Sequence, residues 1–273
     1  MRNKSLLKMP EDEKRIVELY TKEHLYISQI RKIYHCRESK IVDILHNNGI
    51  ATNNEGKYLN RALKADYFDV IDTEVKAYLL GFITADGSVG YRKNRREAGT
   101  FKIELQESDE EILDLILEEL NCKSTKRIRE RNEKNTISIS VSSTYLVKSL
   151  EKYGVIPNKT YKLESLYTDF SDKIFLKAYL RGLFDGDGSL YFVNNSYHAS
   201  FTEGLLHIVQ QFQNIIDDEI GIERHTKINS NTAHHAVWNG VNCCKLCHYL
   251  YDDSSVFLTR KYDIAKEIFE RYL

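Results

Sequence analysis

The chain has 273 residues, of which 42% are hydrophobic, so it can bury a sizeable core and hold more than one domain. Its formal net charge of −1 excludes a uniformly basic nucleic-acid binder, so binding to nucleic acid would require segregated charge. Five cysteines without a signal peptide favour a reducing compartment, expected to be the cytoplasm of a bacterium or a phage-infected cell, and no apolar run reaches the ~20 residues of a membrane span.

Three short helices are predicted near the N-terminus, at residues 10–20, 28–34 and 38–47. In the second helix Ile30 and Ile33 are expected to face inward, and Asn48-Gly49 is a typical end for the third. Residues 1–64 are net basic, with 13 Lys and Arg against 8 Asp and Glu. This part of the chain therefore differs in charge from the remainder.

The three helices resemble a helix-turn-helix DNA-binding module, here residues 1–50. In that interpretation the third helix enters the major groove with Ser39, Lys40, Asp43 and His46. The alternative is a small helical bundle that docks on the rest of the chain or binds protein. Residues 51–65 are predicted to be a basic linker, in which Lys57 and Arg61 either follow the DNA backbone or are solvated.

Two matching stretches follow, Ala77–Ser88 and Ala178–Ser189, at an offset of 187 − 86 = 101 residues. Both have the pattern A-Y-L-x-G-apolar-apolar-x-small-D-G-S, which predicts an apolar helix that ends at Asp-Gly and leads into a strand. Each helix carries a stripe of small residues, namely Gly81, Ala85, Gly182 and Gly186. Because glycine inside a helix costs about 1 kcal/mol relative to alanine, the stripes predict that the two helices pack closely on each other.

That packing would bring Asp86 and Asp187 together at the carboxyl ends of the two helices. A helix carboxyl end carries partial negative charge, so a carboxylate placed there needs a cation. Two neighbouring carboxylates also resist joint ionisation unless cations bridge them. The pair therefore predicts a metal-ion site, and the alternative is that the two Asp-Gly pairs are only helix stop signals.

The two stretches resemble the paired signature of the LAGLIDADG homing endonucleases, with Leu79–Gly87 and Leu180–Gly188 at its nine positions. The resemblance implies an α+β fold, in which two αββαββα halves related by a pseudo-twofold axis form a saddle behind a small all-α domain. The halves would span residues 66–160 and 161–273, with the two signature helices on the axis.

The resemblance also implies that Asp86 and Asp187 are catalytic and hold the divalent metal, Mg²⁺, for which Mn²⁺ can substitute. Gln106, at the end of a predicted strand, would help to arrange water near the metal, and Thr202 matches that place in the second half. The earlier acidic position of the motif is Asp185 in the second stretch but Thr84 in the first. This departure is mild if the position mainly helps to end the helix.

Charge in the first half is sorted by element, because its hairpins are basic and its predicted helix at residues 108–120 is acidic. The strands predicted at 101–106 and 136–142 alternate apolar and polar residues, which favours a sheet with one polar face toward a DNA groove. An ordinary half-exposed sheet is the alternative. Side chains expected to contact DNA from the two halves are Arg92, Lys93, Arg95, Arg96, Lys102, Lys126, Arg127, Arg129, Arg131, Asn195, His198 and Lys227.

The second half repeats the order of elements, but its hairpins carry amides and histidines more than Lys and Arg. Such side chains can read base edges. The electrostatic attraction to DNA is therefore expected to come mostly from the first half and the N-terminal helices.

One cysteine-rich run offers a competing site. Cys243, Cys244, Cys247 and His248, with His234 and His235, have the spacing of zinc ligands. The run falls at the entry to a predicted core helix, where cysteine commonly packs as a small apolar residue. Core packing is therefore favoured over zinc.

These patterns predict a site-specific, metal-dependent endonuclease that cleaves double-stranded DNA as a monomer with internal pseudo-twofold symmetry and without a membrane partner. The resemblance implies a staggered break and insertion-site homing. Two alternatives stay open: a DNA-binding regulator on the same scaffold that no longer cuts, and an RNA-binding maturase that assists intron splicing.

Overall fold

The computed structural model describes residues 10–23, 25, 27–50, 63–91, 98–130, 135–223, 227–230 and 233–272. The chain divides into two compact units, Met1–Leu63 and Lys64–Leu273. Seven of the basic residues predicted to contact DNA lie outside the described residues: Lys57, Arg61, Arg92, Lys93, Arg95, Arg96 and Arg131.

The first unit contains the three predicted helices, α1 (Pro10–Thr21), α2 (Ile27–Tyr34) and α3 (Glu38–Asn47). Their apolar faces meet in one core, which includes Ile16, Ile30, Ile41 and Leu45. Ile33 is 48% exposed, so the prediction that it faces inward is wrong. The buried stripe of the short α2 runs from Ile30 to Tyr34, four residues apart, and this turns Ile33 outward. That this unit binds DNA stays a prediction.

The second unit runs through the same order of elements twice. The first half contains α4 (Glu74–Asp86), β1 (Gly87–Tyr91), β2 (Gly99–Gln106), a 3₁₀ turn (Glu107–Asp109), α5 (Glu110–Glu119), β3 (Arg127–Arg129), β4 (Thr136–Ser142), α6 (Thr144–Glu151) and the short α7 (Lys159–Lys162). The second half contains α8 (Lys173–Asp187), β5 (Gly188–Val193), β6 (Ser196–Glu203), α9 (Leu206–Glu219), β7 (Asn229–Ser230), β8 (His234–Asn239), α10 (Val241–Tyr251) and α11 (Thr259–Tyr272). The predicted α+β architecture of two αββαββα halves is confirmed.

Each half holds one four-stranded antiparallel sheet, in the order β1-β2-β4-β3 and β5-β6-β8-β7. The registers differ, because Gly87 lies opposite Ile103 in the first hairpin whereas Gly188 lies opposite Phe201 in the second. The first hairpin therefore spans 103 − 87 = 16 residues between paired positions and the second 201 − 188 = 13. The two sheets therefore have the same order of strands, but their first hairpins differ in length.

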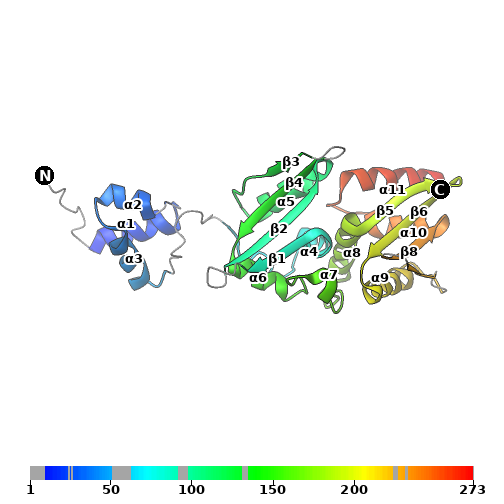
Figure 1. Ribbon diagram of the computed structural model, residues 1–273, viewed down its shortest axis with the longest axis horizontal. Coiled ribbons are helices and arrows are strands. Elements are labelled where there is room, and N and C mark those ends of the chain that lie inside the picture. The colour runs from blue at the N-terminus through cyan, green and yellow to red at the C-terminus, as the bar shows by residue number, and fades with distance from the viewer. Residues whose placement is uncertain are drawn as a thin grey trace. The chain divides into compact units, whose positions relative to one another are not determined.

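One face of each sheet is covered by helices and the other, called here the outer face, is not. Phe101, Ile103 and Leu105 on β2 are buried, and they alternate with polar residues on the outer face as predicted. Helices α5 and α6 pack on the first sheet, and α9 and α10 pack on the second. The helices α4 and α8 pack along each other between the two sheets (Figure 1).

The segment before α4 is tied to the first half through Asp69. Its carboxylate accepts hydrogen bonds from the hydroxyls of Tyr145 and Ser149 and from the ammonium of Lys152, the last two at 2.6 and 3.2 Å. These hydrogen bonds lower the pKa of Asp69 to about 2. Thr73 then caps α4 by accepting from the backbone N–H of Lys76 at 3.2 Å.

Across the described residues, every helix is too short or too polar to pass through a bilayer.

Candidate active site and DNA-facing surface

The two signature helices touch backbone to backbone at their glycines. A Cβ on Gly81 would lie 2.0 Å from the carbonyl oxygen of Tyr179, and one on Gly182 would lie 2.1 Å from that of Tyr78. A Cβ on Gly186 would lie 2.3 Å from the Cβ of Ala85. No side chain fits at these distances, so the glycines are what allows the helices to approach this closely. The structure thus brings together all four small residues of the predicted stripes.

The close approach places the two motif aspartates at one end of the helix pair. Asp86 is the last residue of α4 and exposed, and Asp187 is the last residue of α8 and half-buried. Desolvation, followed by the charges of Asp86 and Glu203, raises the pKa of Asp187 to about 8. Desolvation also raises the pKa of Asp86, against the opposing charges of Lys159 and Lys261. This end of the helix pair therefore gathers acidic groups whose ionised forms need a nearby cation.

Two lysines lie close to these acidic groups. Lys159, the first residue of α7, donates to the carbonyl oxygen of Ala85 at 2.6 Å, and it lies within electrostatic reach of both aspartates. Lys261 on α11 is buried and donates to the carbonyl oxygens of Phe184, Asp185 and Gly188 at 2.6 to 2.7 Å. Each lysine thus binds orphan carbonyls at the end of one signature helix. Burial lowers the pKa of both, that of Lys261 to about 8.

These two lysines were not among the predicted site residues, although the sequence carries a signal for them. Lys159 follows Asp86 by 159 − 86 = 73 residues and Lys261 follows Asp187 by 261 − 187 = 74, so the repeat extends beyond the motif. Arg260 was not predicted either; it forms a two-pronged ion pair with the buried Asp109 at 2.8 and 2.9 Å. That pair ties α11 of the second half to the first half, beside Asp86.

The earlier acidic position of the motif does more than end a helix. The buried carboxylate of Asp185 accepts from the hydroxyls of Tyr78 and Tyr251 at 2.8 and 2.6 Å and from the backbone N–H of Leu258 at 2.8 Å. Asp185 therefore joins α8 to α4, α10 and the loop before α11. The expectation that Thr84 is a mild replacement is incomplete, because Thr84 donates its one hydroxyl proton within its own helix, to the carbonyl of Leu80 at 2.8 Å.

Because Thr84 replaces an aspartate in the first motif, Tyr179 has no carboxylate to bind as Tyr78 has Asp185. Tyr179 stands 101 residues after Tyr78, at the equivalent position of the second motif. Its hydroxyl is fully buried near Thr84 and the backbone of Tyr167, but within the described part of the chain no contact of this hydroxyl has the geometry of a hydrogen bond. Burial raises the pKa of Tyr179 to about 12. A second buried polar contact joins the two helices. Arg181, which is 1% exposed, forms an ion pair with Glu74 and donates to the carbonyl oxygens of Val256 and Leu250 at 2.7 and 2.8 Å.

Gln106 is the last residue of β2 and is exposed. The interactions of the described residues include no hydrogen bond from Gln106 to either aspartate. Thr202, its predicted counterpart, bonds to His235 Nδ1 at 2.8 Å. The water-arranging role of Gln106 stays a prediction.

The aspartate pair fits a divalent cation that is shared with a phosphate. Mg²⁺ prefers hard oxygen ligands and is commonly bound by one or two carboxylates together with substrate phosphates and water. Asp86 and Asp187 supply two such carboxylates at a place where their mutual repulsion calls for a cation. The described residues contain no cluster of three or more His, Cys, Asp or Glu side chains that could cage a metal without substrate.

The outer face of the first sheet carries three of the basic residues that were predicted to contact DNA. Lys102, Arg127 and Arg129 are exposed there, and Glu104 contacts Lys102 at 2.7 Å and Arg129 at 3.7 Å. Lys126 does not reach this face, because Glu110 and Asp114 of α5 bind its ammonium. Its ammonium is already engaged, so a DNA contact by Lys126 stays a prediction.

The other predicted contacts lie on the surface. Ser39, Lys40, Asp43 and His46 are exposed on α3 of the first unit. In the second half Lys227 is exposed before β7, and His198 lies on the outer face of β6. Asn195 sits in the β5–β6 turn with φ of 61°, where its backbone and side-chain oxygens accept from Arg271 at 3.0 Å.

The cysteine-rich run is part of the core. Cys243, Cys244 and Cys247 are buried on α10, so these cysteines are part of the packed core. His248 bonds to Asp252 at 2.8 Å and stacks on Phe269. His234 and His235 bond elsewhere, to Ser230 and Thr202. The described side chains therefore do not converge as zinc ligands.

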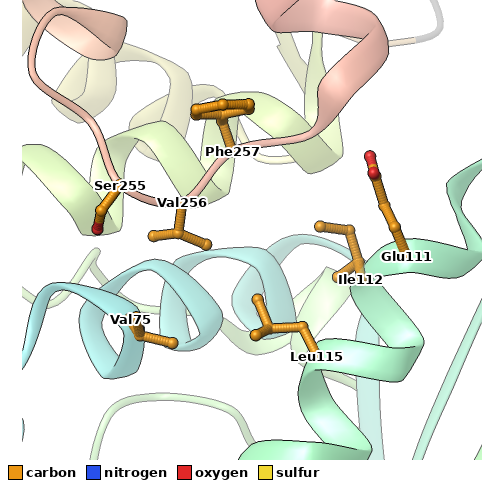
Figure 2. Close-up of a pocket in the computed structure, with 7 residues that line it drawn as sticks. All are labelled: Val75, Glu111, Ile112, Leu115, Ser255, Val256 and Phe257. Atoms are coloured by element: carbon orange, nitrogen blue, oxygen red, sulfur yellow. The ribbon is translucent and has the colours of Figure 1, made fainter.

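A separate apolar crevice of about 250 Å³ includes Val75, which lies in the first turn of α4, whereas Asp86 is the last residue of that helix (Figure 2 shows the lining residues). It is lined by Val75, Glu111, Ile112, Leu115, Ser255, Val256 and Phe257. Its polar residues are already engaged, since Ser255 donates to Glu74 at 2.5 Å and Glu111 accepts from Thr259 at 2.6 and 2.8 Å. The crevice offers no converging reactive groups.

Comparison with known proteins agrees with this fold. The family model described as LAGLIDADG endonuclease matches residues 79–168, and that described as LAGLIDADG-like domain matches residues 175–266. The chain belongs to the LAGLIDADG family. A search of curated protein sequences returned no match.

Solved structures similar to this chain include three LAGLIDADG proteins. A point mutant of I-SmaMI is 14% identical with a TM-score of 0.50, over 71% of this chain and 91% of that chain. I-AabMI bound to uncleaved DNA is 15% identical with a TM-score of 0.47, over 71% and 89%. I-DmoI in complex with DNA and Ca is 15% identical with a TM-score of 0.49, over 71% and 97%. At such identities the similarity to I-SmaMI bears on the fold alone.

Proposed function

We propose that this chain is a site-specific endonuclease that cleaves both strands of a DNA duplex with a divalent metal, Mg²⁺ or Mn²⁺. The observation that carries the proposal is the meeting of Asp86 and Asp187 at the ends of two glycine-packed helices, beside Lys159 and Lys261. Membership of a family whose model is described as LAGLIDADG endonuclease supports nuclease chemistry.

The two aspartates and the two lysines would have different roles in the reaction. Asp86 and Asp187 would hold the metal, which when bound lowers the pKa of water and stabilises charge on the phosphate. Lys159 places an ammonium beside both carboxylates and would stabilise a phosphate brought between them. Lys261 is buried against the end of α8 and would keep Asp187 in position.

The outer faces of the two sheets would lie along the major groove. Lys102, Arg127 and Arg129 would supply attraction to phosphates in the first half. His198, Asn195 and Lys227 would contribute from the second half.

The first unit would extend the contact through α3. Lys40 is exposed on that helix, so Lys40→Gln is expected to lower affinity and flatten the salt dependence by about one unit of slope. Lys14→Gln on α1 is the matched control, and equal effects of the two would argue against α3 as the contacting helix.

The test begins with a random duplex library from which bound sequences are selected, followed by cleavage of the selected duplex in Mg²⁺. Wild type is expected to linearise a plasmid that carries the site, and EDTA is expected to stop it. Asp86→Asn and Asp187→Asn should each abolish double-strand cleavage while binding persists. Asp218→Asn, at an exposed position on α9, is the control.

The outcomes separate the alternatives. Tight binding without cleavage in Mg²⁺ or Mn²⁺ would contradict the nuclease and support a non-cleaving regulator. Preference for structured RNA over the selected duplex would support a maturase. Cleavage that survives both aspartate substitutions would remove the proposed site.

A further inference from the structure

Outer-face residues of the second sheet line up in rows across its strands. One row is Tyr191 on β5, His198 on β6 and Asn239 on β8. The next row is Ser189, Ser200 and Val237, and a third joins Thr202, His235 and Asn229. In an antiparallel sheet such directly opposed residues are neighbours on one face. Each row therefore presents its side chains as a group.

The Tyr191 row is already assembled in the protein. The rings of Tyr191 and His198 stack with centroids 5.4 Å apart and planes within 8°. His198 Nδ1 hydrogen-bonds Asn239 Oδ1, which leaves the amide N–H₂ of Asn239 as a donor. Thr202 and His235 are joined in the same way in the third row. Side chains held by one another lose little freedom when they bind a partner.

This face differs in charge from its counterpart. In the first sheet three of the outer-face rows contain Lys102, Arg127 or Arg129. Among the described strand residues of the second sheet, the outer face carries no Lys, Arg, Asp or Glu. It exposes apolar surface instead, with Tyr191 41% exposed and Val193 42% exposed.

We infer that the second sheet recognises an A·T-rich half-site by base-edge contacts, while the first sheet provides most of the attraction to phosphates. This inference rests on the proposed function. The thymine methyl is the apolar group of the major groove, and Val193, Val237 and Tyr191 are apolar contacts for it. Asn side chains pair with adenine, whereas guanine is most often bound by Arg or Lys, which the described strands do not offer on this face.

The experiment selects bound duplexes from a random library with wild type and with Tyr191→Ala, Val193→Ser and Arg127→Gln. Val193→Ser changes an exposed side chain, and the fluorescence of the single tryptophan, Trp238, verifies folding of each variant. For each protein, affinity for the wild-type duplex is then measured across a range of salt concentrations.

We expect one half of the wild-type consensus to be A·T-rich. Tyr191→Ala and Val193→Ser should reduce discrimination for thymine in that half by about 10-fold and leave the salt slope unchanged. Arg127→Gln should leave that half of the consensus intact and flatten the salt slope by about 0.9.

The inference is overturned if the second-sheet variants leave the consensus unchanged, if they change a G·C-rich half, or if they flatten the salt slope as Arg127→Gln does. A library that yields no selected duplex overturns the proposed function itself and this inference with it. A selection that yields a site without an A·T-rich half overturns the inference alone.

Discussion

Two tyrosines at equivalent positions of the signature helices are expected to respond in opposite ways to loss of the hydroxyl. Tyr78 donates to the buried Asp185 at 2.8 Å, whereas the buried hydroxyl of Tyr179 makes no hydrogen bond of normal geometry among the described residues. Both side chains are 0% exposed and both belong to the packed helix pair. Tyr78→Phe and Tyr179→Phe therefore form a matched pair that isolates one hydrogen bond.

The magnitude follows from the partners. A hydrogen bond to a charged group contributes about 1.5–3 kcal/mol, and Asp185 keeps two other donors, so Tyr78→Phe should lower the free energy of unfolding by about 2 kcal/mol. An unsatisfied buried hydroxyl is unfavourable, so Tyr179→Phe should change it by between zero and about 1 kcal/mol in the stabilising direction. For a unit of this size, Tyr78→Phe would lower Tm by about 4–8 °C.

Trp238 makes the assay specific. It is the single tryptophan of the chain, it is 1% exposed, and its indole N–H donates to Asp217 at 2.6 Å. Its fluorescence during denaturant unfolding reports the unit Lys64–Leu273 without a contribution from the first unit. Equal losses in the two variants, or a loss above about 1 kcal/mol in Tyr179→Phe, would refute the assignment of partners.

Three further predictions use the same reporter or the cleavage assay. Gly182→Ala should lower the free energy of unfolding by about 2 kcal/mol or more, because the added Cβ would lie 2.1 Å from a carbonyl oxygen of the facing helix. This loss is expected although alanine is the better helix former. Gly90→Ala is the control, since its added Cβ would have no atom within 4 Å, and equal losses in the two variants would contradict the packing. Asp69 has a folded pKa of about 2 against an ordinary value of 3.8, so its stabilisation is present above pH 4 and lost as pH falls toward 2. The stability difference between wild type and Asp69→Asn should therefore shrink over that window in acid unfolding, and a constant difference would contradict it. Lys159→Gln should slow cleavage of the selected duplex at least 10-fold while binding of the duplex is retained. Lys162 is exposed, and Lys162→Gln, the control, should leave the cleavage rate unchanged. Similar rates in the two variants would exclude Lys159 from the site.

The helix pair was predictable because its evidence is local and repeated. The motif alone places Gly81 and Gly182 in register, and glycine inside an apolar helix indicates a close neighbour. The strand at Thr136–Ser142 was equally accessible, because strict alternation has few other physical explanations. Both are properties that a few adjacent residues determine.

What was not predictable depends on residues far apart in the chain. Lys261 reaches the end of α8 from 73 residues beyond Gly188, and its neighbours do not mark it as a helix cap; its only sequence signal is that its distance from Asp187 nearly repeats the distance of Lys159 from Asp86. Lys126 resembles its basic neighbours in sequence, yet acids 12 and 16 residues away on α5 bind it. Asp185 looked like a helix stop until Tyr251 and Leu258 were placed around it. In each case folding selects one partner from several that the sequence permits.

Because of the buried polar contacts between the two halves, each half is suited to pair with the other half and not with a second copy of itself. The first half contributes Glu74 and Tyr78, and the second contributes Arg181 and Asp185. At the 101-residue offset, Phe175 stands where Glu74 does, so two copies of the second half would bury arginines without counter-charges, at a cost of about 3–5 kcal/mol each. Self-pairing is thereby disfavoured, and a chain severed between its halves should reassemble with its complement rather than with its own kind.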